Sequence, residues 1–233
     1  MKPPRGLFVT GTDTGVGKTY VTCLLARQLQ QRGISVGIYK PVCSGAEPAP
    51  GNSIYWPDVD RLHESLHRKS PEDWICPQKF AAPLAPPVAA RREDRTVDSD
   101  LLRSGVNVWN DQVDVLLVEG VGGWKCPLTD RETVSDLARA LKFPVLVVAA
   151  NRLGMISQTL LTLESVTFSG LHPMAAVVNS VSAEDDGTQA SNADCLKTLT
   201  DVPIMGPLAW APSPQEGGTE PVDRVLELWL ASG

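Results

Sequence analysis

A glycine-rich segment near the start of the chain constrains the fold more than any other feature: Gly11-Thr-Asp-Thr-Gly-Val-Gly17-Lys18-Thr19. It follows a short apolar run, residues 7–10, which predicts a buried strand. It precedes a helix-length segment, residues 18–32, which Gly33 is placed to end. Backbone N–H groups of such a loop, together with the positive end of the next helix, form a cradle for anions. The order of strand, loop and helix therefore predicts a phosphate-binding site in an α/β fold.

Two side chains at the end of this loop have the chemistry that ATP requires. The Lys18 ammonium would reach the β- and γ-phosphates, and the Thr19 hydroxyl would bind Mg²⁺. Five residues rather than four separate Gly11 from Gly17, so the loop departs from the strict G-x4-G-K-[ST] spacing. The alternative is a glycine-rich turn with an exposed lysine, and the coincidence of strand, Gly-Lys-Thr and helix disfavours it.

The rest of the chain repeats the pattern of apolar strand, turn and helix. Near-continuous apolar runs suit parallel strands that are covered on both faces. We therefore expect an α/β fold with one open, mostly parallel sheet and helices on both faces, and residues 1–233 are expected to form a single domain. The further strands are expected at residues 36–40, 113–118, 144–150 and 174–178, helices at 99–112, 133–142 and 222–230, loops and short helices over 45–95, and a loop over 211–220.

Charge and cysteine content exclude several classes of function. A formal net charge of -6 argues against nucleic acid or an anionic membrane as the main partner. No run approaches the length of a membrane-spanning helix or a signal peptide, so a cytoplasmic protein is expected. The five cysteines are scattered and include no Cys-x-x-Cys pair, which favours reduced thiols over disulfides or a zinc site; they are Cys23, Cys43, Cys76, Cys126 and Cys195.

Charged side chains end two of the predicted strands. Glu119 follows an apolar run and leads into Gly120-Val-Gly-Gly123. A carboxylate at the carboxyl end of a parallel strand, beside a phosphate loop, is well placed to bind a metal ion; a solvated residue at a strand end is the alternative. Lys40 ends the second strand before Pro41, at the same edge of the sheet.

Several segments together resemble the dethiobiotin synthetase family. They are the long-form phosphate loop Gly11–Thr19, Lys40-Pro-Val-Cys-Ser-Gly45, Val118-Glu-Gly-Val-Gly-Gly-Trp124 leading to Pro127-Leu128, Arg152-Leu-Gly-x-Ile156 and Val178-Asn179. The resemblance covers most of the chain and implies a P-loop NTPase-like fold. Two positions depart from the family pattern: Ala85-Pro-Pro87 stands where Ser-Pro-His is usual, and Ser157 stands where an Asn is expected.

The resemblance also implies roles for particular residues. Asn179 would read adenine, because an amide both donates and accepts hydrogen bonds, although a turn residue is the alternative. The second metal ligand would be Asp58, with Asp60 a substitute and a helix N-cap the other interpretation of Asp58. The implied catalytic residues are Lys18, Lys40 and Thr14, and the implied Mg²⁺ ligands are Thr19, Asp58 and Glu119. The implied ATP contacts are Asp13, Thr14, Gly15, Val16, Gly17, Lys18, Thr19, Tyr20, Asn179, Pro207, Leu208 and Ala209. The implied substrate contacts are Lys40, Ser44, Gly122, Gly123, Leu153, Gly154 and Ser157.

The implied reaction is ring closure of 7,8-diaminopelargonate with CO2 and ATP, in a homodimer, with no nucleic acid or membrane partner. Two alternatives remain open at this point. A P-loop ATPase switch that binds protein partners would carry a second lysine early in the loop, where this chain has Asp13. A related amide-forming ligase acting on another acid is the closer alternative, although the chain lacks the length for an attached glutaminase domain.

Overall fold

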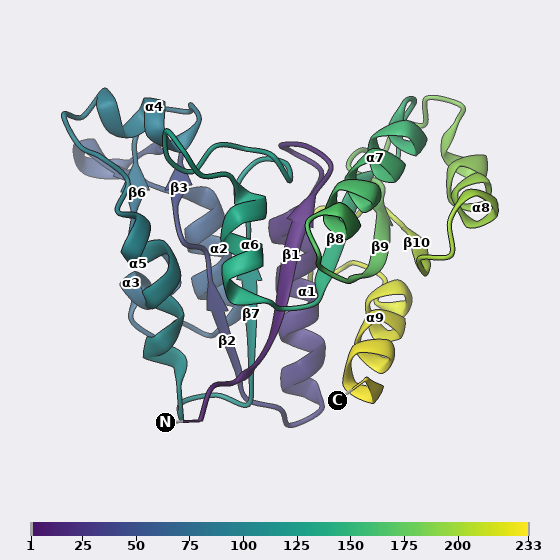
Figure 1. The fold of residues 1–233 in the computed structure, drawn as a ribbon, viewed down its shortest axis with the longest axis horizontal. Coiled ribbons are helices and arrows are strands. Elements are labelled where there is room, and N and C mark those ends of the chain that lie inside the picture. The colour runs from purple at the N-terminus through teal and green to yellow at the C-terminus, as the bar shows by residue number, and fades with distance from the viewer. Residues whose placement is uncertain (1, 233) are drawn as a thin grey trace.

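The computed structural model describes residues 2–232 and centres on a six-stranded sheet (Figure 1). Its strand order is β10-β9-β8-β1-β7-β2, and every neighbouring pair is parallel. The expected α/β fold with one open parallel sheet is therefore confirmed. The strands are β1 (Arg5–Gly11), β2 (Val36–Tyr39), β7 (Val115–Glu119), β8 (Val145–Ala150), β9 (Pro173–Asn179) and β10 (Ile204–Leu208).

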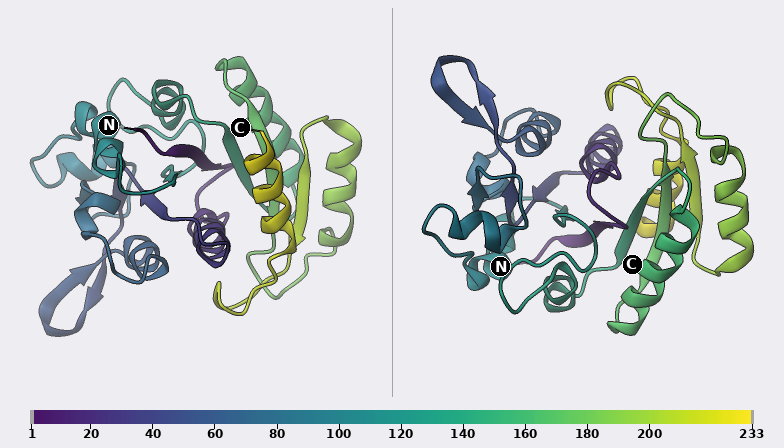
Figure 2. Two further views of the ribbon diagram at one scale, coloured as in Figure 1. Left: turned by 90° about the horizontal axis from the view of Figure 1, so that it is seen from below. Right: turned by 90° about the horizontal axis from the view of Figure 1, so that it is seen from above.

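Helices cover both faces of this sheet, as expected. Figure 2 shows α1, α2 and α9 on one face and α6 and α7 on the other. Every residue of β2, β7, β8 and β9 is buried, which explains why these strands are apolar except for the Glu119 and Asn179 that end β7 and β9. The α-helices are α1 (Lys18–Gln31), α2 (Pro57–Ser65), α3 (Glu72–Ile75), α4 (Pro86–Arg91), α5 (Ser99–Ser104), α6 (Val134–Leu141), α7 (Met155–Phe168), α8 (Gln189–Leu199) and α9 (Glu220–Ala231).

Local signals account for several helix ends. Gly33 has a φ of 75° directly after α1, in the left-handed region that glycine tolerates. Thr133 and Asp136 form a capping box that starts α6. The helix expected over residues 99–112 is instead the shorter α5 followed by a 3-10 turn, η2 (Gly105–Trp109). A Cβ on Gly105 would lie 2.2 Å from the Tyr39 hydroxyl, so this turn packs close against β2.

The region expected to hold loops and short helices contains small strands as well. A parallel pair joins β3 (Cys43–Ser44) to β6 (Lys79–Phe80), and an antiparallel hairpin joins β4 (Glu47–Ala49) to β5 (Ser53–Tyr55) around the 3-10 turn η1 (Pro50–Asn52). Strands of two or three residues carry too little alternation to be recognised in a sequence. Among residues 2–232, no helix has the length and apolar character needed to cross a membrane.

Parallel strands bring their carboxyl ends to one edge of the sheet, where α/β folds bind their ligands. The phosphate loop follows β1, Lys40 follows β2, Glu119 ends β7 and Asn179 ends β9. Because β1 lies between β7 and β8, the loop is at the middle of this edge. The topology therefore gathers residues that are far apart in the chain.

Candidate active site

The phosphate loop has the conformation of an anion cradle. Gly15 and Gly17 have φ angles of 73° and 90°, both in the left-handed region. Helix α1 begins directly after Gly17 and has no side-chain N-cap, so its first N–H groups are free to face a phosphate. The Lys18 side chain is buried and its Nζ donates to the Asp13 carbonyl at 2.9 Å, so the alternative of an exposed lysine is wrong.

A cluster of opposite charges, in which Lys40 and Glu119 are buried and Asp58 is partly exposed, lies beside this loop. Lys40 Nζ is 2.6 Å from Glu119 Oε1 and 2.9 Å from Asp58 Oδ2. The Thr19 hydroxyl donates to the same Glu119 oxygen at 2.7 Å. Lys40 and Glu119 are 2% and 0% exposed, so water screens this ion pair little. The structure thus brings together residues from α1, α2, β7 and the end of β2.

The pKa values of these groups reflect their mutual contacts. Burial lowers the pKa of Lys40, but the charges of Glu119 and Asp58 outweigh burial and hold that pKa well above its usual value. The Lys40 charge lowers the pKa of Asp58 against the effect of burial. Burial, and next the Lys40 charge, lower the pKa of Lys18 to about 8. The cluster therefore keeps Lys40 protonated and Asp58 ionised.

The oxygen atoms of this cluster suit a hard divalent cation. Glu119 Oε2 is buried and has no hydrogen-bond partner, and the Thr19 hydroxyl contacts the other oxygen of that carboxylate. Residues 2–232 contain no group of three or more His, Cys, Asp or Glu side chains that could hold a metal. One or two carboxylates are the protein ligands that Mg²⁺ typically takes, together with substrate phosphates and water.

Asp58 and Asp60 differ in their contacts. Asp60 pairs with Arg68 at 2.6 Å and takes no part in the cluster. Asp58 lies in the first turn of α2 and pairs with Lys40, whereas the N-cap position belongs to Trp56. Geometry thus favours Asp58 over Asp60, and the N-cap interpretation of Asp58 is wrong.

Asn179 has a contact that the sequence did not predict. Its Nδ2 donates to the Val16 carbonyl at 3.0 Å, so the end of β9 holds the phosphate loop in place. Its Oδ1 is buried without a partner and is free to accept a hydrogen bond. Leu208 pairs with Asn179 in the sheet, which brings the predicted base contacts Pro207, Leu208 and Ala209 next to it.

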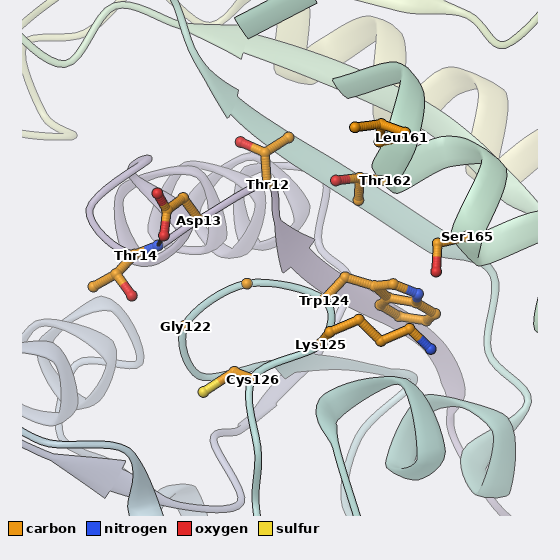
Figure 3. A pocket seen from close by; sticks show the side chains of 11 residues that line it. Thr12, Asp13, Thr14, Gly122, Trp124, Lys125, Cys126, Leu161, Thr162 and Ser165 are labelled. Carbon is orange, nitrogen blue, oxygen red and sulfur yellow. Dashed lines mark hydrogen bonds between the residues drawn. The ribbon is translucent and has the colours of Figure 1, made fainter. Parts of the chain in front are cut away.

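An open cavity of about 560 Å³ extends from the phosphate loop toward α7 (Figure 3). Of the predicted site residues it includes Asp13, Thr14, Gly122 and Gly123. Gly122 has a φ of 60° and its missing side chain leaves room for Cys126, whose Sγ would lie 2.7 Å from a Cβ there. The complete lining is Thr12, Asp13, Thr14, Gly122, Gly123, Trp124, Lys125, Cys126, Leu161, Thr162 and Ser165.

Other predicted substrate contacts lie outside this cavity. The Ser44 hydroxyl donates to the Leu84 carbonyl at 2.6 Å. Leu153, Gly154 and Ser157 are exposed around the start of α7, and Leu153 is 78% exposed. None of these three residues lines the cavity.

Two kinds of residue were missed from the sequence. Trp124, Lys125 and Cys126 directly follow Gly122-Gly123 in the sequence. Their place in the cavity could therefore have been predicted from that segment. Leu161 and Ser165 lie one helical turn apart on α7, and nothing in the sequence links that helix to the phosphate loop. At the departure from the family pattern, Pro87 is buried in the first turn of α4 and supplies no side-chain donor.

A larger cavity, about 740 Å³, lies elsewhere. Its walls come from α1, α2, His67 and residues 212–215, and they include Tyr20, one of the predicted ATP contacts. The smaller cavity is the one that includes residues of the phosphate loop, namely Thr12, Asp13 and Thr14.

Comparisons with known proteins give one consistent family. Residues 5–216 match a family described as an AAA domain. The ATP-dependent dethiobiotin synthetase BioD of Anaeromyxobacter sp. (strain Fw109-5) is 46% identical over 182 residues, which are 78% of this chain and 79% of that protein. The protein with the same name from Aromatoleum aromaticum is 34% identical over 230 residues, which are 99% of each chain.

A solved structure with a similar fold is the signal recognition particle receptor FtsY from Elizabethkingia anophelis. Its TM-score is 0.52 at 19% identity, and the alignment covers 97% of this chain and 66% of that one. At this identity the similarity concerns the fold alone, an α/β sheet with a phosphate loop.

Proposed function

The chain belongs to the ATP-dependent dethiobiotin synthetase family, and we propose that it forms the cyclic urea of dethiobiotin from 7,8-diaminopelargonate, CO2 and ATP with Mg²⁺. We propose further that it works as a single P-loop ligase domain. The observation that carries the proposal is the cluster of buried Lys40 and Glu119 with the partly exposed Asp58 beside the phosphate loop. This arrangement supplies positive charge for phosphoryl groups and oxygen ligands for a metal.

The chemistry needs little from the protein except positioning and charge. One substrate amine attacks CO2 and loses a proton, which gives a carbamate. A carbamate oxygen attacks the γ-phosphorus of ATP, and ADP leaves. The second amine attacks the carbamate carbon, phosphate leaves with the C–O bond electrons, and the ring closes. No step requires a protein nucleophile.

Named side chains have separate tasks in this proposal. Lys18 binds the β- and γ-phosphates, and Lys40 neutralises the carbamate and the phosphoryl group that it accepts. Thr19, Asp58 and Glu119 would hold Mg²⁺, which when bound screens the phosphate charges. The cavity beyond Thr14 would receive the diamine.

A homodimer is part of the proposal. Large apolar side chains are exposed on or beside α7: Leu153, Leu161 and Phe168 are 78%, 63% and 94% exposed. Leu161 also lines the substrate cavity. A second copy covering α7 would remove this apolar surface from water and bring its own residues 153–157 toward the cavity.

The test traces the labelled carbon of bicarbonate into the product. Incubation with ATP, Mg²⁺, labelled bicarbonate and 7,8-diaminopelargonate should place the label in a cyclic urea, with one phosphate released per ring. Lys40→Ala should still bind ATP but trap no label, because the carbamate loses its counter-charge. Phosphate release that responds neither to the diamine nor to bicarbonate would contradict the proposal. A response to a different acid and to ammonia would instead favour an amide-forming ligase.

A further inference from the structure

We infer that Lys40 and the metal ion compete for one pair of carboxylates, so that binding of the metal frees the Lys40 ammonium to meet the reacting groups. The inference rests on the metal site of the proposed function, but it does not depend on the identity of the acid substrate. It concerns the order in which the site becomes active.

The contacts of Lys40 motivate the inference. Its ammonium bridges Glu119 Oε1 and Asp58 Oδ2 at 2.6 and 2.9 Å, and these are the two carboxylates proposed as metal ligands. The Lys40 backbone N–H donates to the Ile75 carbonyl at 2.7 Å, which anchors the main chain beside β2. Any exchange therefore has to involve the side chain, which has four rotatable bonds.

Charge balance explains why both cations cannot hold the pair equally well. Two carboxylates carry two negative charges, whereas an ammonium and a divalent cation together carry three positive ones. A metal ion binds a carboxylate oxygen at about 2.0–2.1 Å, well inside the distance at which like charges repel in a site with little water. Lys18 is close enough for the Lys40 charge to lower its pKa, so a further cation already borders the cluster.

Glu119 offers the metal a first point of attachment. Its Oε2 is buried and unpartnered, whereas Oε1 already accepts from both Thr19 and Lys40. Glu119 Oε2 and Asp58 would hold the metal, and the Lys40 ammonium would then lose Asp58 as a partner. The freed ammonium then has the phosphates and the carbamate as its nearest negative partners. Lys40 would thus be delivered to the reaction only after the metal has arrived.

The first test measures metal affinity without nucleotide or diamine. Mn²⁺ uses the same oxygen ligands as Mg²⁺, and its EPR signal reports the free ion. Lys40→Met, which keeps the side-chain length and loses the charge, should bind Mn²⁺ at least about tenfold more tightly than the parent protein. Lys40→Arg keeps the charge and should bind Mn²⁺ like the parent.

The second test measures thermal unfolding with and without Mg²⁺. Lys40→Met should unfold at a lower temperature than the parent without Mg²⁺, because two carboxylates lose their partner. Mg²⁺ should also raise the unfolding temperature of Lys40→Met by more than it raises that of the parent. Lys79→Met is the matched control, since the Lys79 ammonium also contacts two carboxylates, Glu72 and Asp73, at 2.5 and 3.2 Å on a more exposed helix. Mg²⁺ should not restore that variant.

The outcomes separate the possibilities. Equal Mn²⁺ affinity in Lys40→Met and the parent, with a loss of stability that Mg²⁺ does not reduce, would overturn the inference and leave Lys40 a purely structural charge. No Mn²⁺ binding by the parent in the presence of ADP would overturn the proposed metal site itself. If Lys40→Met folds neither with nor without Mg²⁺, ¹⁵N NMR of the parent protein decides. The Lys40 ammonium signal is the one that is absent in Lys40→Arg. Addition of Mg²⁺ should shift this signal, and an unchanged signal would refute the exchange.

Discussion

Replacing Gly17 by alanine should expose how the phosphate loop is held. Gly17 has a φ of 90°, and a Cβ built on it would lie 2.1 Å from Asn179 Nδ2. No bond rotation of a methyl group relieves such an overlap, so the Asn179 side chain has to move. That movement breaks its hydrogen bond to the Val16 carbonyl. The single added carbon therefore acts on two elements, α1 and β9.

The expected cost follows from two contributions. A left-handed φ costs a residue with a Cβ about 1–2 kcal/mol, and a buried amide that loses its partner costs about 1–3 kcal/mol. The free energy of unfolding should therefore fall by about 2–5 kcal/mol. For a protein of this length, each kcal/mol lowers Tm by about 2–4 °C. Gly15→Ala supplies the control, because Gly15 has a φ of 73° and no atom within 4 Å of its missing Cβ. Gly15→Ala should therefore lose only the free energy that the left-handed φ costs.

Thermal unfolding of a double-mutant cycle tests this reasoning. In an Asn179→Ala background the overlap disappears, so Gly17→Ala should cost about as much there as Gly15→Ala does in the parent. Nucleotide affinity, measured by titration calorimetry, should fall in Gly17→Ala because the Asn179 amide, which we predict to bind the base, is displaced. Equal Tm values for Gly15→Ala and Gly17→Ala, or no rescue in the Asn179→Ala background, would refute the proposed contact.

Further predictions concern the charge cluster and the assembly. Asp58→Asn should raise the Mg²⁺ concentration needed for half-maximal rate, whereas Asp60→Asn should not. The reason is that Asp58 pairs with Lys40 and Asp60 pairs with Arg68. Matching Mg²⁺ titrations for the two variants would contradict this prediction. The affinity for ADP should fall as pH rises through about 8, because the pKa of Lys18 lies near 8 and only its charged form attracts phosphate. Calorimetry in buffers of different ionisation enthalpy should then show proton uptake on binding at pH 9, and this uptake should disappear in Lys18→Met. Sedimentation should show a dimer, and a fully active monomer at assay concentration would argue against the second-subunit role of residues 153–157.

The sheet could be predicted from the sequence because its strands are buried on both faces. The runs at 113–118 and 144–150 are apolar at almost every position, and the observed strands differ from them by one or two residues. The hairpin of β4 and β5 could not be predicted in the same way. Its residues are mostly exposed and include Pro48, so neither burial nor alternation marks them.

The candidate site divides along similar lines. Lys18, Lys40 and Glu119 could be placed together because each follows a strand of one parallel sheet, and such strands end at a common edge. The contact of Asn179 with the Val16 carbonyl could not be predicted, since it depends on side-chain direction and on the exact path of the loop. The same holds for Leu161 and Ser165, which reach the cavity only through the packing of α7. The functional roles of the site residues stay predictions until they are tested.

The position of β1 in the sheet has a consequence for synthesis on the ribosome. The strand emerges first, yet its partners are β7 and β8, whose first residues are Val115 and Val145. At roughly 5–20 residues per second, the nascent chain carries an unpaired apolar strand for on the order of ten seconds before β7 is available. A nascent-chain chaperone would find its binding segment in residues 5–11 during that interval. The strand that leads into the phosphate loop is thus made well before the two strands that enclose it.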